Sequence, residues 1–114
     1  MEGKDMNVYS GAERRRHPRI CEPFPATVRS VDVSGTAFQA ETVLKDFSAG
    51  GLGVRLGQRV ESGARLFAVV RFSTAMDPNA PAPHVAVRGV VRRAEPQPDG
   101  LWGVGVQFTR HRFL

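Results

Sequence analysis

Four arginines lie within six residues near the N-terminus, with no acidic residue between them: Arg14, Arg15, Arg16 and Arg19. A guanidinium group can hold a phosphate through two parallel hydrogen bonds, meet the O6 and N7 acceptors of guanine, and stack on a purine ring. Only Arg15 and Arg19 stand four residues apart, and Pro18 favours an extended backbone before it. The cluster predicts an extended arm that binds a nucleotide, nucleic acid or acidic lipid headgroup, although a solvated basic arm has the same composition.

A second segment whose residue types could bind a ligand is the run Asp-Phe-Ser-Ala-Gly-Gly at residues 46–51. The short side chains of Asp46 and Ser48 can bond to nearby backbone, and Gly50 and Gly51 permit positive φ and close approach of another group. Such a turn can present backbone N–H groups to an anion. Asp46 can also accept the N1–H and N2–H donors of guanine. Taken alone, the segment is more typical of an ordinary turn between strands, where Asp, Ser and Gly are all common.

These two segments must be positioned by strands, because apolar residues recur with a period of two along most of the chain. Six alternating segments are expected, at 24–33, Thr36–Asp46, Leu52–Leu56, Leu66–Phe72, Val85–Val91 and Trp102–Phe108. The alternation slips near Ser30, which predicts a β-bulge there. Turn residues separate the segments, and no helical stripe is present. We expect an all-β fold, a six-stranded antiparallel barrel, since a closed barrel leaves no unprotected edge strands.

The length of 114 residues suits one domain. We expect a flexible tail at 1–12, a barrel domain at 13–110 that includes the arginine-rich arm, and a short C-terminal tail at 111–114. No apolar run is long enough to span a membrane, and no signal peptide is visible at the N-terminus. The single cysteine, Cys21, indicates a reducing compartment, so a cytoplasmic location is expected.

Enzymatic chemistry is not indicated. The three histidines, His17, His84 and His111, are far apart and have no neighbours at metal-ligand spacing. Neither a nucleophile elbow, nor a phosphate-binding loop of the Walker type, nor an acid–base pair is present. We therefore expect no catalytic residues, no metal and no cofactor.

In combination the two segments resemble the motifs of the PilZ domain family, a bacterial family. Its RxxxR motif matches Arg15 and Arg19, preceded by Arg14, and its (D/N)xSxxG motif matches Asp46, Ser48 and Gly51. The ending Trp102–Phe108 is similar to the closing strand of that family, although many members continue into a helix. The resemblance implies a split barrel that binds cyclic di-GMP, as one molecule or a stacked pair.

By this resemblance the arginines contact phosphate and guanine, and the turn holds a guanine and the ribose-phosphate edge. The implied ligand-binding residues are Arg14, Arg15, Arg19, Asp46, Ser48 and Gly51, with Arg16 and Gly50 beside them. The implied function is a receptor, used in signal transduction, that orders its arm on the ligand and signals to a separate partner protein.

Two other functions compete with this one. A PilZ-like protein-interaction module would work without a nucleotide, but it usually has degraded motifs. A nucleic-acid binder would use surface aromatics interleaved with basic residues, which this sequence lacks, so we expect no nucleic-acid partner.

Overall fold

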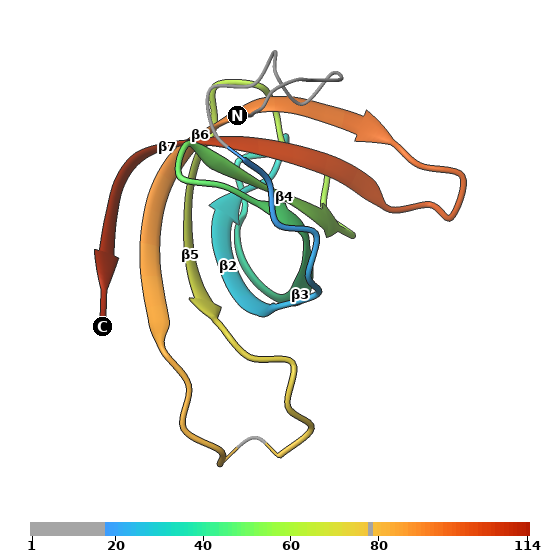
Figure 1. The fold of residues 1–114 in the computed structure, drawn as a ribbon. Coiled ribbons are helices and arrows are strands. Elements are labelled where there is room, and N and C mark those ends of the chain that lie inside the picture. The colour runs from blue at the N-terminus through green and yellow to red at the C-terminus, as the bar shows by residue number, and fades with distance from the viewer. Residues whose placement is uncertain (1–17, 78) are drawn as a thin grey trace, which may run out of the picture.

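Six antiparallel strands form a closed barrel in the computed structural model, which describes residues 18–77 and 79–114 (Figure 1). They are β2 (Pro25–Val31), β3 (Ala37–Phe47), β4 (Gly51–Leu56), β5 (Arg65–Arg71), β6 (His84–Pro96) and β7 (Trp102–Phe113). Around the barrel the order is β2-β3-β4-β7-β6-β5. The predicted six-stranded antiparallel barrel is confirmed.

The core consists of the apolar residues that alternate along each strand. Fully enclosed members come from β2, β5 and β6, where Val28, Val70 and Val91 have no exposed surface. Leucines of β3 and β4, such as Leu44 and Leu52, complete the interior. Small branched side chains dominate because a barrel of six strands has a narrow interior. The alternating faces read from the sequence are therefore the inner and outer faces of the barrel.

The expectation of a β-bulge near Ser30 is wrong. β2 pairs with β3 in unbroken register from Pro25 to Val31. Ser30 occupies an inward position and is only 8% exposed, and its hydroxyl donates to the carbonyl of Arg65 at 2.7 Å. A small hydroxyl can take a core position when the neighbouring strand supplies an acceptor. The apparent slip in the sequence was a polar residue on the inner face.

Register shifts occur elsewhere, and two of them lie beside the predicted site. One separates Leu44 from Asp46 where β3 pairs with β4. Another separates Val91 from Arg93 where β6 pairs with β7. A bulge leaves one residue unpaired and redirects the side chains around it. These two shifts determine which side chains face the outer surface of the barrel near the turn at 48–50.

The expectation of a C-terminal tail at 111–114 is also wrong for residues 111–113, which belong to β7. β7 continues to Phe113, which pairs with Val85, and the N–H of Leu114 donates to the carbonyl of His84 at 2.9 Å. The long strand β6 supplies these backbone partners, so β7 extends although its last residues are mostly polar. In the part of the chain that the structure describes, no helix is long and apolar enough to cross a membrane.

Candidate functional site

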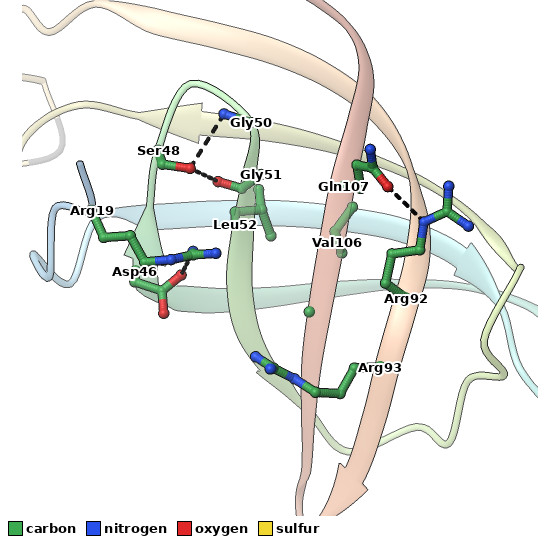
Figure 2. A pocket seen from close by; sticks show the side chains of 11 residues that line it. Arg19, Asp46, Ser48, Gly50, Gly51, Leu52, Arg92, Arg93, Val106 and Gln107 are labelled. Atoms are coloured by element: carbon green, nitrogen blue, oxygen red, sulfur yellow. Dashed lines mark hydrogen bonds and ion pairs between the residues drawn. The ribbon is translucent and has the colours of Figure 1, made fainter. Parts of the chain in front are cut away.

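The end of the arginine-rich arm is fixed beside the end of β3. Ile20 and Phe47 exchange two backbone hydrogen bonds, of 2.7 and 2.8 Å, as an isolated antiparallel bridge. This bridge brings Arg19 to the bulged end of the strand. There Nη1 of Arg19 donates to Oδ1 of Asp46 at 2.8 Å. The last arginine of the first motif and the first residue of the second are thus in direct contact (Figure 2).

Ser48 shapes the turn that follows. Its backbone N–H donates to the carbonyl of Gly51 at 2.9 Å, and its Oγ accepts from the N–H of Gly50 at 3.2 Å. The side chain is buried, with 6% of the residue exposed. The N–H groups of Ser48 and Gly50 are therefore engaged within the turn, so these two groups are not free to bind an anion.

Of the two properties that glycine permits at residue 51, the structure uses close approach and not a positive φ. The φ of Gly51 lies outside the left-handed region, whereas a Cβ at this position would lie 2.2 Å from the carbonyl oxygen of Val106. That distance is far inside van der Waals contact, so β4 can approach β7 this closely only with glycine here. The final glycine of the motif thus holds the turn against the neighbouring strand.

A cluster of aromatic rings packs around Phe47, at the start of the turn. The ring of Phe47 lies 5.1 Å from that of Phe72 and 5.6 Å from that of Phe108, and Phe24 contacts Phe72 edge-to-face. Such edge and tilted arrangements are the favourable geometries for aromatic pairs. Because Phe47 lies between Asp46 and Ser48 in sequence, this cluster fixes the backbone that carries both motif residues.

A hollow of about 320 Å³ opens on the outer surface beside this turn. Its wall contains the motif residues Arg19, Asp46, Ser48, Gly50 and Gly51, together with Leu52, Arg92, Arg93, Gly105, Val106 and Gln107. Figure 2 shows Arg19 and Asp46 on one side and the two β6 arginines on the other, with β4 and β7 passing between them. This volume is at the lower end of the range for small-molecule pockets.

Sequence reasoning missed Arg92 and Arg93. The register of β6 against β7 passes from Val91–Val106 to Arg93–Gly105, so Arg92 is the extra residue of the bulge. Both arginines are consequently exposed on the outer surface. The signal was available as two consecutive arginines in a strand that otherwise alternates, which is a pattern that a bulge explains.

The β6 arginines are held in different ways. Nε of Arg92 donates to Oε1 of Gln107 at 2.7 Å. Arg93 extends over Gly105, where an added Cβ would lie 3.3 Å from its Nε. Gly105 lines the hollow and pairs with Gly53 of β4, which is buried beneath the carboxylate of Asp46: an added Cβ at Gly53 would lie 3.1 Å from Oδ1. We call this pair, Gly53 and Gly105, the glycine floor.

The charges around the hollow are unbalanced. Arg19, Arg92 and Arg93 face a single carboxylate, Asp46, among the residues that line it. The excess is two positive charges. Within the described residues, Oδ1 of Asp46 is engaged by Arg19, and no hydrogen bond is made to Oδ2. The site thus offers guanidinium groups to an anion and a carboxylate oxygen to a pair of N–H donors.

Other predicted residues fall outside the described part of the chain. Arg14, Arg15 and Arg16 belong to this group, as does the tail at 1–12. The ligand roles of all the predicted residues, including the five that meet around the hollow, stay predictions. Between residues 18 and 114, leaving out residue 78, no three His, Cys, Asp or Glu side chains are grouped as metal ligands would be.

Comparisons with solved structures agree with the barrel. The chain is similar to the Bacillus subtilis inhibitor of motility (MotI/DgrA), with 20% identity and a TM-score of 0.65, covering 85% of this chain and 43% of that protein. It therefore spans less than half the length of that relative.

Two further structures have a TM-score of 0.54 and 17% identity. One is the PilZ domain of YcgR from Escherichia coli, solved with c-di-GMP, where the match covers 85% of this chain and 79% of that one. The other is an F420 reductase, covering 92% and 98%. At these identities the likeness shows the fold alone, and the presence of a reductase among the matches shows that this fold serves more than one activity.

Among curated protein sequences, none matches this chain closely enough to count as a relative. The family model for the PilZ domain, however, matches residues 13–112. This range includes both motifs and all six strands of the barrel apart from Phe113, the last residue of β7. The chain belongs to the PilZ domain family.

Proposed function

We propose that this chain is a receptor for cyclic di-GMP and that the hollow between Arg19 and the β6 arginines holds the ligand. The observation that carries the proposal is the placement of three guanidinium groups and one carboxylate around the glycine floor. PilZ domains are regulatory, ligand-binding modules rather than a family of enzymes. The similar barrel of YcgR, solved with c-di-GMP, supports the same ligand class here.

The chemistry of the ligand matches the hollow. Cyclic di-GMP carries two phosphodiester charges, which the excess of two positive charges would balance. Its guanine edge presents N1–H and N2–H donors, and Oδ2 of Asp46, to which no described residue donates, can accept them while Oδ1 stays bonded to Arg19. A flat guanidinium such as that of Arg93 can stack on a purine. Gly105 of the glycine floor lets the ligand approach the backbone of β7 closely.

The rest of the arm completes the site in this proposal. Arg15 precedes Arg19 by four residues, so an extended chain places it within roughly 14 Å of the rim. Arg14, Arg15 and Arg16 repel one another in the absence of an anion, and the ligand's phosphates remove that repulsion. We therefore expect ligand binding to order the arm over the hollow and to change the surface that a separate partner protein meets. A cytoplasmic location fits this role.

Isothermal titration calorimetry tests the proposal. Wild-type protein should show saturable binding of cyclic di-GMP and no comparable binding of GMP, which has one phosphate and one base. Arg19→Ala should weaken binding roughly tenfold, the lower end for a charge-assisted contact, because Arg19 is a third exposed. Arg29→Ala is the matched control, since Arg29 is an exposed arginine of β2 that does not line the hollow.

Absence of binding to the wild type at high micromolar ligand would refute the proposal. In that case the nucleotide-independent interaction module becomes the better explanation. It predicts that a partner is recovered equally well with and without cyclic di-GMP, and also after the arm arginines are replaced.

A further inference from the structure

The last residues of β7 have an open strand edge. β4 pairs with β7 only from Trp102 to Gln107, and the carbonyl of Gly50 takes the N–H of Phe108. Beyond Phe108, β7 pairs with β6 on its other edge, and no described residue pairs with the edge that β4 has left. In Figure 1 this dark red end of β7 lies at the outside of the barrel, with β6 on one side and no strand on the other.

The backbone groups on this edge can be assigned. Leu114 donates to His84, so its backbone faces β6. Successive residues of a strand direct their N–H and C=O groups to opposite edges. His111 and Phe113 therefore direct theirs away from β6, toward the open edge. An unpaired row of this kind is a template for an added strand.

One face of the open edge is apolar. The side chains of His111 and Phe113 line a hollow of about 470 Å³ with Pro18, Ile20, Phe47, Ser48, Ala49, Val85 and Phe108. Phe113 is 68% exposed and Ile20 is 47% exposed, which is unusual for large apolar side chains placed together. Apolar side chains of an added strand would enter this hollow and remove those surfaces from water.

The opposite face of the same edge is basic. Arg110 and Arg112 lie there, and Arg110 is directly opposite Arg88 of β6. Like charges directly opposite each other destabilise a sheet. None of these three arginines forms an ion pair with another described residue. Acidic side chains on an added strand would relieve this repulsion.

Two occupants from this chain itself fit poorly. A second copy pairing edge to edge would bring Arg110 and Arg112 against the same residues of its partner, adding to the repulsion. The N-terminal residues 1–17 carry four basic and three acidic side chains, with three of the basic ones immediately before the barrel. They lack alternation of acidic and apolar residues.

We propose that the open edge of β7, from Thr109 to Phe113, is a docking site for an extended segment of a partner protein in which acidic and apolar residues alternate. The segment adds as a strand, with main-chain bonds to His111 and Phe113, apolar side chains in the hollow, and acidic ones beside Arg110 and Arg112. This names the partner chemistry left open above, but its residues and its test are separate from the ligand site.

A synthetic peptide of about seven residues, alternating glutamate and valine, is the probe, because this length spans the edge. We expect saturable binding, by fluorescence anisotropy without cyclic di-GMP, and amide shifts in NMR spectra at His111 and Phe113. A lysine-and-valine peptide is the control and should not bind. If that control binds equally well, the charge assignment is wrong and the proposal fails.

Two variants test the geometry. His111→Pro removes an N–H that points to the open edge and leaves the β6 ladder intact, so the barrel should fold and the peptide should bind roughly tenfold more weakly. The double variant Arg110→Glu with Arg112→Glu should bind the peptide at least about tenfold more weakly than the wild type. The control Arg29→Glu on β2 should bind it as tightly as the wild type does.

Unchanged affinity in the charge-reversed variant would overturn the proposal, whether or not His111→Pro folds. Concentration-dependent dimerisation that the peptide cannot displace would also overturn it, in favour of a second copy. A failed titration with cyclic di-GMP would refute the ligand proposal and leave this one standing.

Discussion

Replacement of Gly105 by alanine separates binding from stability at the centre of the hollow. A Cβ there would lie 3.3 Å from Nε and Nη2 of Arg93, the mobile end of an exposed side chain, so the barrel can accommodate it. Glycine within a strand costs roughly 0.5–1 kcal/mol relative to alanine. The free energy of unfolding should therefore stay the same or rise, as measured by urea denaturation.

Ligand binding should change in the opposite direction. The added methyl group would occupy space above Gly105 that the ligand needs, and it would displace Arg93. Extra volume in a closely packed contact costs about 1–3 kcal/mol, here in the binding free energy. We expect cyclic di-GMP to bind about tenfold more weakly by calorimetry, which corresponds to about 1.4 kcal/mol. Gly57→Ala is the control, because a Cβ at Gly57 would meet nothing within 4 Å. Equal affinity for wild type and Gly105→Ala would show that the ligand does not use the floor.

Two further predictions concern stability. Gly51→Ala should destabilise the barrel by about 3 kcal/mol in urea, because its Cβ would lie 2.2 Å from the backbone oxygen of Val106; a loss no larger than that of Gly57→Ala would contradict this packing argument. The hydroxyl of Ser34 donates to Asp32 at 2.6 Å and, with nearby backbone N–H groups, lowers the pKa of that carboxyl. Because this pKa is lowered in the folded state, ionised Asp32 stabilises the fold at pH values above the ordinary Asp pKa near 4, and the stabilisation is lost as pH falls through the folded pKa. The free energy of unfolding of the wild type should therefore exceed that of Asp32→Asn by less and less between about pH 6 and pH 3. If the difference in urea midpoint between wild type and Asp32→Asn stays constant with pH, the hydrogen bonds to Asp32 do not stabilise its ionised form.

The sequence by itself determined the fold class and the family. Alternation of apolar residues is a local property of a strand, because side chains point to opposite faces in turn, so it is visible without coordinates. The two motifs were visible for a similar reason, since their spacing along the chain is the recognisable feature. Ser30 shows where this reasoning fails, because a polar residue on the inner face looks like a break until its partner strand is known.

Only the tertiary structure decided what completes the site. Arg92 and Arg93 lie more than forty residues beyond Asp46, and no local pattern relates them to it. They reach the hollow because β7 lies between β4 and β6 and because a bulge turns both arginines outward. The need for glycine at residue 51 likewise depends on the oxygen of Val106, a contact between distant strands. Strand pairing and register are properties of the whole barrel, and they determine which side chains the motifs meet.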